Sequence, residues 1–298
     1  MTRSGFVALA GRPNVGKSTL VNAMVGRKVA IVSDKPQTTR RAIRGVATHT
    51  GGSDPWQLVL TDLPGVQRPR DALTERMQRS VEREFADADS VLFLVNGDQG
   101  VGGPGDRFIA GALQRAGLPV VLAVNKADRL NRNRTVAALQ AAADLGLEGA
   151  EVFPISARTG LGVPALVEHL VSLLPEGPFL FGAEDVSDQA ESVMLAELVR
   201  EQVLRRTRQE VPHSVEVQVD EISEEAGLVT VRALLWVETE SQKGIVIGQR
   251  GAMIKAIGTA ARKQIEAITG LRCHLALRVR VRKDWRRDEG LLDRLGIE

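Results

Sequence analysis

Cysteine is almost absent from this chain, which has a single one, Cys273, among its 298 residues. One thiol excludes an internal disulfide, and this cysteine usage fits a reducing cytosol. The sequence also lacks a zinc-binding pattern, because the adjacent Cys273 and His274 have no second pair of ligands at the spacing that zinc sites require. We expect these two residues to lie in a strand and to point to opposite faces of a sheet.

Long apolar runs are absent as well. The longest ones, such as Pro119–Val124, have the length of a strand and are too short to cross a bilayer. The N-terminal residues lack the cleavage pattern of a signal peptide. The formal net charge is only +2, so the overall charge does not point to nucleic acid. The composition is that of an ordinary soluble protein, and local motifs must indicate its ligands.

The length of the chain suggests two domains, and its first half has the pattern of one of them. Up to about Leu174, short apolar runs followed by Gly, Pro, Asn or Asp alternate with helical patterns. The runs are Phe6–Ala10, Gln57–Thr61, Val91–Val95, Pro119–Val124 and Val152–Ile155. This alternation predicts an α/β domain with a mostly parallel, doubly wound sheet. Its ligands should bind beyond the carboxyl ends of the strands.

The second half has a different order of elements. Prolines, glycines and acidic residues interrupt regular structure between Leu173 and Gln189. Beyond them the patterns predict a helix, two strands, two helices and a strand, which is an α+β domain. These elements are expected at Ala190–Gln209, Ser214–Ile222, Leu228–Val237, Lys243–Ile247, Ala252–Ile268 and Cys273–Val281. We therefore expect domains at residues 1–175 and 190–298, with a linker at residues 176–189.

A phosphate-binding motif, G-x-x-x-x-G-K-[ST], begins at Gly11, after an apolar strand and before a helical pattern. In this motif backbone N–H groups surround phosphate oxygens at a helix N-terminus. The Lys17 ammonium reaches the β- and γ-phosphates, and the Ser18 hydroxyl is a ligand of Mg²⁺. The predicted nucleotide-binding residues here are Gly11, Arg12, Pro13, Asn14, Val15, Gly16, Lys17, Ser18 and Thr19.

Two further motifs follow later strands of the predicted sheet. The first, D-x-P-G, offers the Asp62 carboxylate to Mg²⁺ through water and the Gly65 amide to the γ-phosphate. The second, N-K-x-D, offers the Asp128 carboxylate to the two N–H donors of guanine, which adenine lacks. The predicted contacts are Asp62, Leu63, Pro64, Gly65, Asn125, Lys126 and Asp128, with Ser156 and Ala157 supporting the base edge. The sequence thus predicts GTP and GDP as ligands.

The residue after the D-x-P-G glycine is Val66, where Ras-type enzymes have a glutamine that orients water. Hydrolysis must then be slow or use another device. One hypothesis is that a carbonyl of Asn14 helps to hold a monovalent cation such as K⁺ beside the phosphates. In the loop Asp34–Arg40 we favour Thr39 over Thr38 as a switch residue that binds Mg²⁺ with GTP. The expected catalytic residues are Asn14, Lys17, Thr39 and Gly65, and the metal ligands are Ser18, Thr39 and Asp62.

Charge is strongly polarised in the second half. The stretch Gln242–Arg287 has twelve basic and two acidic side chains, and Ser214–Ser241 has seven acidic and one basic. A basic segment of this kind is typical of phosphate binding. The G-x-x-G at Gly248–Gly251 lies between two predicted helices, as in KH modules, although alone it could be a plain turn. The expected RNA contacts are Lys243, Ile245, Val246, Ile247, Gly248, Gln249, Arg250, Gly251 and Lys255.

With these motifs in this order, the chain resembles the Era family of bacterial GTPases, which have a C-terminal type II KH domain. The matching segments are Gly11–Asn22, Lys35–Arg40, Asp62–Gly65, Asn125–Asp128, Leu174–Pro178, Glu210–Val215 and Ser241–Lys255. The resemblance implies a switch with Mg²⁺ that binds the 3′ end of 16S rRNA in the GTP state and acts in 30S subunit assembly. It also implies a cytoplasmic protein, with a fraction peripherally at the inner membrane. We expect a monomer.

Two other functions remain open at this point. A GTPase that signals at a membrane surface could use the basic segment to bind anionic lipid. An RNA-modification enzyme with an accessory GTPase domain would need a nucleophile, and the only thiol, Cys273, lies in a predicted strand. The glycine loop between two helices favours RNA over lipid, and the position of Cys273 in a predicted strand counts against the RNA-modification enzyme.

Overall fold

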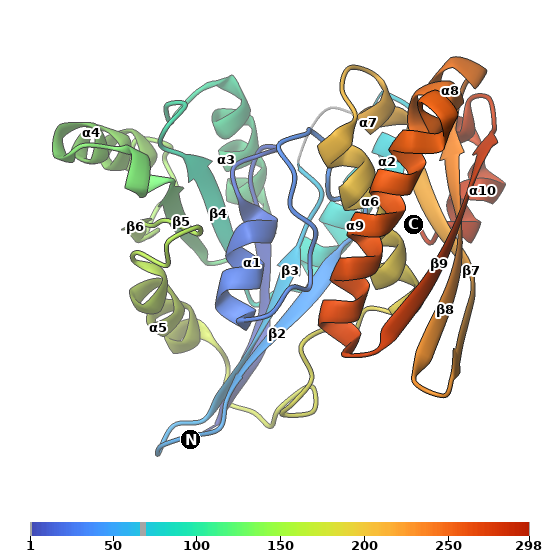
Figure 1. Ribbon diagram of the computed structural model, residues 1–298. Helices are drawn as coiled ribbons and strands as arrows, with labels where there is room; N and C mark the ends of the chain where they lie inside the picture. Colours follow the sequence, from blue (N-terminus) through green and yellow to red (C-terminus); the bar gives the residue numbers. More distant parts are fainter. Residues whose placement is uncertain (1, 66–69, 298) are drawn as a thin grey trace. The chain divides into compact units, whose positions relative to one another are not determined.

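The computed structural model describes residues 2–65 and 70–297 and divides into two compact units (Figure 1). The first unit consists of Met1–Ala30, Thr39–Arg70 and Thr74–Asp188, and the second of Ile31–Thr38, Asp71–Leu73 and Gln189–Glu298. The second unit therefore includes two short stretches from early in the chain. Residues 176–188, which the sequence suggested as a linker, lie within the first unit.

The first unit is built on a six-stranded sheet in the order β2-β3-β1-β4-β5-β6. All its strands pair in parallel except β2, which is antiparallel to β3. Its strands are β1 (Arg3–Ala10), β2 (Ile43–His49), β3 (Trp56–Asp62), β4 (Ser90–Asn96), β5 (Val120–Asn125) and β6 (Val152–Pro154). The predicted α/β class and mostly parallel sheet are confirmed.

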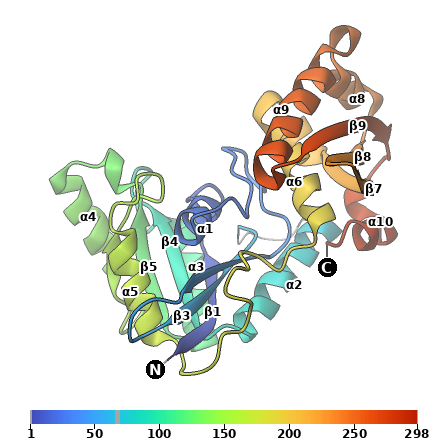
Figure 2. The same ribbon diagram turned by 60° about the horizontal axis from the view of Figure 1, so that its bottom comes forward.

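Helices cover both faces of this sheet (Figure 2). In β1 the side chains alternate, since Val7 and Leu9 join one apolar cluster and Ala8 and Ala10 the other. Helices α1 and α5 contribute to the first cluster, and α2, α3 and α4 to the second. Their bounds are α1 (Lys17–Val25), α2 (Ala72–Ala86), α3 (Pro104–Ala116), α4 (Arg132–Ala143) and α5 (Val163–Leu173). The loops at the carboxyl ends of the strands carry the motifs.

Strand β2 was not predicted, because Ile43–His49 contains Arg44, Gly45 and Thr48 and has no continuous apolar run. Its conformation comes from antiparallel pairing with β3, in which Val46 lies opposite Val59. The amide of Val46 also donates to the carbonyl of Val186 over 2.9 Å. The chain before the second unit thus runs along the outer strand of this sheet.

The second unit contains a three-stranded sheet in the order β7-β8-β9 (Figure 1). Strands β7 and β8 are antiparallel, whereas β8 and β9 are parallel. The elements are α6 (Glu191–Arg206), α7 (Val211–Ser214), β7 (Glu216–Glu225), β8 (Leu228–Val237), α8 (Glu240–Ile247), α9 (Ala252–Thr269), β9 (Arg272–Val281) and α10 (Glu289–Arg294). The predicted order of helices and strands is confirmed, with α7 and α10 added.

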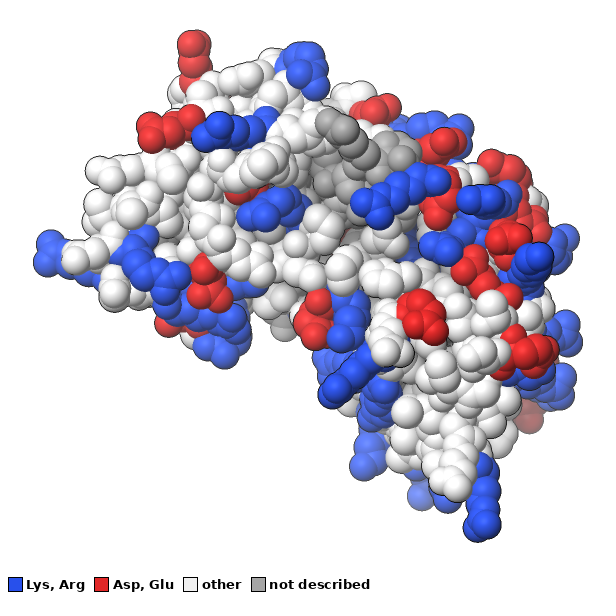
Figure 3. Space-filling model, turned by 90° about the horizontal axis from the view of Figure 1, so that it is seen from above, with Lys and Arg blue, Asp and Glu red and all other residues white. Residues whose placement is uncertain are grey.

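The core of the second unit lies between this sheet and helices α6, α8 and α9. Cys273 is buried and its neighbour His274 is exposed, as expected for adjacent strand residues. Among the described residues, no helix combines the length and the apolar character needed to cross a membrane. On the face that Figure 3 shows, basic and acidic side chains are interspersed.

Candidate functional site

The loop between β1 and α1 has the backbone shape that phosphate binding requires. Gly16 caps the N-terminus of α1 with a φ of 107°. A Cβ atom there would lie 2.4 Å from Nδ2 of Asn125, so only glycine fits without displacing that side chain. The loop and the helix N-terminus that follows it present backbone amides to an anion. Val15 anchors the loop, since its side chain is buried in the core beneath it.

Lys17 is the first residue of α1, at the end of this loop, and it is only 6% exposed. Its Nζ donates to the carbonyls of Gly11, over 3.0 Å, and of Arg12, over 3.3 Å. Burial lowers the pKa of Lys17 to about 8, and the charge of Asp62 opposes this effect only in part. A polyphosphate bound here would supply the negative charge that the ammonium lacks.

Three side-chain oxygens that were predicted to hold Mg²⁺ meet beside Lys17. Oγ of Ser18 lies 3.2 Å from Oγ1 of Thr39, which lies 3.3 Å from Oδ2 of the fully buried Asp62. Octahedral ligands at about 2.1 Å from Mg²⁺ have neighbours about 3 Å apart, so the spacing of Ser18 and Thr39 suits two ligands of one ion, with Asp62 beside them to bind through water. Thr38 is turned away, because its hydroxyl donates to the carbonyl of Lys35 over 2.7 Å.

Asn125 connects the base-binding loops to the phosphate loop. Its Oδ1 accepts from the amides of Lys126, over 2.8 Å, and Ala157, over 3.0 Å. Its Nδ2 donates to the carbonyl of Val15 over 2.8 Å. The Lys126 ammonium in turn donates to the carbonyl of Asn14 over 3.1 Å. Asn125 and Lys126 therefore hold three loops in one arrangement.

Asp128, the predicted contact for the guanine base, has a carboxylate that two neighbouring side chains bond. A hydrogen bond from Ser156 is the main reason that the pKa of the Asp128 carboxyl is lowered, and Arg158 adds a second bond. The Arg158 guanidinium lies 2.6 Å from Oδ2 of Asp128. The carboxylate is therefore ionised at neutral pH and can accept hydrogen bonds from two guanine N–H groups.

Sequence reasoning missed two partners of these loops. Nε of Arg12 lies 2.7 Å from Oδ1 of Asp106 in α3, and the Asp106 carboxylate is fully buried. Asp106 thus fixes Arg12 at the edge of the phosphate loop, as Arg158 fixes Asp128. Asp106 lies in no motif, so only its charge could have indicated it, whereas Arg158 directly follows the predicted contacts Ser156 and Ala157.

The other predicted nucleotide residues have varied environments. Leu63 and Pro64 are buried, Pro13, Thr19 and Gly65 are half-buried, and Asn14 is exposed with a φ of 63°. Val66, on which the argument about slow hydrolysis depends, lies outside the described residues.

The G-x-x-G loop joins α8 to α9 in the second unit. Gly248 has a φ of 72°, and a Cβ there would lie 2.6 Å from Cβ of Met253. Glycine is therefore required for the close approach of the two helices. Gln249 and Arg250 are exposed between the glycines, and Lys243 and Lys255 flank the loop on α8 and α9.

The expectation that Ile245, Val246 and Ile247 all contact RNA needs a correction. Ile245 is 41% exposed and Ile247 half-buried, but Val246 is fully buried in the core of the second unit. Successive residues of a helix point about 100° apart, so α8 cannot present all three to one ligand. Val246 therefore supports the fold and is withdrawn as an RNA contact.

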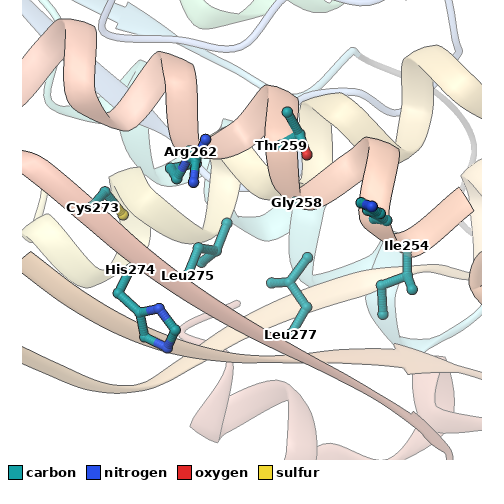
Figure 4. A pocket seen from close by; sticks show the side chains of 9 residues that line it. Ile254, Gly258, Thr259, Arg262, Cys273, His274, Leu275 and Leu277 are labelled. Atoms are coloured by element: carbon teal, nitrogen blue, oxygen red, sulfur yellow. The ribbon is translucent and has the colours of Figure 1, made fainter. Parts of the chain in front are cut away.

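A groove beside the G-x-x-G loop holds residues that the motif did not include (Figure 4). It encloses about 320 Å³ between α9 and β9. The α9 side has Ile254, Lys255, Gly258, Thr259 and Arg262, and the β9 side has Cys273, His274, Leu275 and Leu277. The α9 residues recur every three or four positions and so share one face of the helix. A groove with leucines on the β9 side and basic side chains such as Lys255 and Arg262 on the α9 side suits the bases and phosphates of single-stranded RNA.

Comparison with known proteins matches both units. A family described as 50S ribosome-binding GTPase matches residues 6–126, and the KH domain family matches residues 210–286. GTPase Era of Mycobacterium bovis (strain BCG / Pasteur 1173P2) is 46% identical over 300 residues, covering 99% of this chain and 98% of that protein. The Mycobacterium leprae protein of the same name is 44% identical, covering 99% of each chain.

Two solved structures are similar over the whole chain. One is Era in complex with MgGDPNP and nucleotides 1506–1542 of 16S ribosomal RNA, with a TM-score of 0.95 and 32% identity, covering 100% of this chain and 99% of that one. The other is a variant of Aquifex aeolicus Era bound to GDP·AlF4⁻, with a TM-score of 0.94, 33% identity and 99% of each chain covered. This chain therefore belongs to the Era family, which joins a GTPase domain to a KH domain.

Proposed function

We propose that this chain is a GTP-dependent switch that binds the 3′ end of 16S rRNA and acts in assembly of the 30S subunit. The groove between α9 and β9, in a chain that also has a complete guanine-nucleotide site, carries this proposal. The solved Era complex with MgGDPNP and nucleotides 1506–1542 of 16S ribosomal RNA supports the choice of RNA.

The nucleotide site would work mainly by positioning and by charge. In hydrolysis, water attacks the γ-phosphorus, the bond to the β–γ bridging oxygen breaks, and GDP and phosphate leave. Lys17 would neutralise charge on the β- and γ-phosphates, and the Gly65 amide would donate to the γ-phosphate. Bound Mg²⁺, held by Ser18 and Thr39 with Asp62 behind a water, would withdraw charge from the same oxygens. We expect slow turnover, because the described loops present no general base to the attacking water.

Potassium is a finer part of this proposal. Asn14 is exposed at the rim of the phosphate loop, in a left-handed conformation that its amide side chain tolerates. A carbonyl of Asn14 would be one ligand of K⁺, which would add positive charge where an arginine finger acts in other GTPases. Turnover should be several-fold faster in K⁺ than in Na⁺ at equal ionic strength. Equal rates in the two salts would eliminate this role.

The predicted monomer and the peripheral inner-membrane fraction also belong to the proposal. Exposed basic residues such as Lys255 and Arg262 could attract an anionic surface. A flat lipid surface, however, would not use the recessed groove between α9 and β9. The groove therefore favours RNA over the alternative of a signalling GTPase at a membrane, and no described cluster suggests the chemistry of RNA modification.

Crosslinking to total RNA tests the proposal. The protein is loaded with GDPNP and Mg²⁺, or with GDP, crosslinked, and the attached RNA is sequenced. We expect enrichment of the 16S 3′ end with GDPNP only. Uniform recovery of all RNA in both states would contradict the proposed RNA specificity, although not the binding of GTP.

A further inference from the structure

A stretch from early in the chain, Ile31–Thr38, belongs to the second unit, whereas the residues on both sides of it belong to the first. It follows α1 and precedes Thr39, the predicted magnesium ligand. The chain therefore passes from the nucleotide-binding unit into the RNA-binding unit and back within a few residues. Separate contacts hold this stretch, hereafter the switch segment, at the nucleotide site and in the second unit.

Both ends of the switch segment are tied to the nucleotide site. At its start, Oδ1 of Asn22 accepts from the amides of Val29, over 2.8 Å, and Ala30, over 2.9 Å. Nδ2 of Asn22 donates to the carbonyl of Ala30 over 2.8 Å. Asn22 lies on α1, which begins at the phosphate loop. At the other end, the Thr39 hydroxyl lies among the oxygens of Ser18 and Asp62. A shift of Thr39 must therefore be absorbed within the switch segment.

Helix α6 holds the switch segment in the second unit at three points. The side chain of Ile31 is 3% exposed and packs in the core with Val199 and Val203 of α6. The amide of Val32 donates to Oε1 of Glu201 over 3.0 Å. Near the other end, Nη2 of Arg200 donates to the carbonyl of Thr38. That carbonyl lies in the peptide bond to Thr39, so Arg200 holds the backbone next to the predicted metal ligand.

Arg200 is held in turn by buried acids. Its guanidinium is fully buried and contacts Glu197, at 2.6 Å, and Glu216 of β7, at 3.7 Å. Burial lowers the pKa of Arg200, but the charges of Glu197 and Glu216 outweigh it, so the pKa is raised and the side chain stays charged. Nη1 has no hydrogen-bond partner among the described residues. The guanidinium thus keeps one N–H group that can donate to another carbonyl when the switch segment shifts.

Glu201 connects the same helix to the RNA groove. Its carboxylate is fully buried, and Oε2 accepts from Nε2 of Gln264 over 2.9 Å. Gln264 lies on α9, the helix that also carries the groove residues Thr259 and Arg262. The path from Thr39 through Arg200 and Glu201 to α9 therefore consists of direct contacts and buried charges. Buried, paired charges restrict the side chains to arrangements in which every charge keeps a partner, because an unpaired buried charge is costly.

We propose that Arg200 and Glu201 are positioning residues that couple Thr39 to the RNA groove. This inference rests on the proposed function, since it assumes that RNA binding depends on the bound nucleotide. With GTP, Thr39 is retained at the metal and the switch segment is fixed at both ends. After hydrolysis Thr39 no longer binds the metal. The peptide bond between Thr38 and Thr39 is then positioned by its hydrogen bond to Arg200 alone. Arg200 and Glu201 contact neither nucleotide nor RNA.

The test is the ratio of RNA affinities in the two nucleotide states. The probe is an RNA with the sequence of nucleotides 1506–1542 of 16S ribosomal RNA, titrated into the full chain with GDPNP and Mg²⁺ or with GDP. We expect the wild type to bind at least about fivefold more tightly with GDPNP. Arg200→Lys keeps a charge for Glu197 but cannot bridge three partners, so its ratio should fall to within twofold of one. By linkage, the RNA should change GDPNP affinity relative to GDP by the same factor.

Two further variants separate coupling from damage to the fold. Ile31→Ala removes an anchor of the switch segment without touching a buried charge, and it should lower the ratio as well. Arg206→Lys is the matched control on α6, because Arg206 donates within the helix, to the carbonyl and the side chain of Gln202. Its ratio should stay that of the wild type. If Arg200→Lys and Ile31→Ala weaken RNA binding equally in both states, the two residues are merely structural and the inference is wrong.

Hydrogen exchange gives a reading that does not involve RNA. The amide of Val32 should exchange at least about fivefold more slowly with GDPNP and Mg²⁺ than with GDP, and this difference should vanish in Arg200→Lys. Equal exchange of Val32 in the two states of the wild type would overturn the inference. If the wild type binds the RNA in neither state, the proposed function fails instead, and hydrogen exchange alone decides the coupling.

Discussion

The nucleotide site and the RNA groove are built in different ways. The nucleotide contacts come from loops at the carboxyl ends of strands, and the backbone conformation of glycines such as Gly16 shapes them. The groove comes from one face of α9 and one side of β9. Loops of fixed geometry need fixed residues at fixed spacing, whereas a helix face tolerates many residues of similar character. The first kind of site is therefore visible as a motif and the second is not.

The two sites also differ in how their charges meet solvent. The ammonium of Lys17 is buried, but the side chain of Arg262 is 49% exposed. A buried charge interacts strongly with a ligand and is little screened by salt, whereas an exposed one is weak and screened. Substitutions in the nucleotide site should thus have large effects that salt hardly changes. Substitutions in the groove should have small effects that depend on salt.

The largest effect is expected at the base. Asp128→Asn replaces one of the acceptors for the guanine N–H groups by a donor, and GTP affinity should fall about a hundredfold, or about 2.7 kcal/mol. Affinity for xanthosine triphosphate should rise, because its base offers an acceptor in place of the amine. Titration of both nucleotides measures the shift. Asp98→Asn is a suitable control, since Asp98 pairs with Arg129 nearby. Unchanged base preference in Asp128→Asn would mean that the guanine assignment is wrong.

A smaller effect is expected when the pH is raised past the pKa of Lys17. The free protein has this pKa at about 8, and bound phosphates should raise it, because they stabilise the ammonium. Nucleotide binding then takes up a proton. Affinity is greatest well below pH 8, where Lys17 is fully protonated, and should fall about tenfold between pH 7 and pH 9.

Calorimetry in buffers of different ionisation enthalpy measures this uptake, which should be about half a proton at pH 8. Lys28→Arg, outside the phosphate loop, should leave the decline intact. An affinity that stays flat to pH 9 would show that the burial of Lys17 does not control its charge, and would weaken the contrast between the two sites.

The smallest effect is expected in the groove. Arg262→Gln should weaken RNA binding roughly fivefold at low salt and make the salt dependence shallower by about one phosphate contact. Lys263→Gln removes the same charge from the neighbouring position of α9, which does not line the groove. It should have the smaller effect. If the two variants lose the same affinity, RNA senses only the general charge of α9, and the groove is not a binding site.

The same difference explains what the sequence could predict. The phosphate loop, Asp62 and Asp128 were predictable, because their chemistry demands particular residues next to particular strands. Strand β2 was not, since Ile43–His49 has no apolar run and depends on pairing with β3. The groove was not predicted, because residues such as Thr259 and His274 lie apart in sequence and meet only when α9 packs beside β9. Val246 was placed in the RNA site because the motif does not show which way each residue of α8 points.

The partners of charged residues were the least predictable part. Asp106 fixes Arg12, and Glu216 holds Arg200, yet no spacing in the sequence connects these residues. Only Glu197, three residues before Arg200 on α6, lies at a spacing that pairs side chains on a helix. The contact of the switch segment with α6 joins residues about 160 positions apart, as the bond between Arg200 and Thr38 shows. Such pairs depend on the packing of whole elements, which local patterns do not encode.

The central claim is that bound nucleotide controls binding of the 16S 3′ end, and one titration tests it most directly. The affinity for an RNA of nucleotides 1506–1542 is measured with GDPNP and Mg²⁺ and with GDP, beside a scrambled RNA of equal length. The account predicts tight binding of the 16S sequence with GDPNP, at least about fivefold weaker binding with GDP, and weak binding of the scrambled RNA in both states. Equal affinity for both RNAs, unchanged by the nucleotide, would contradict it.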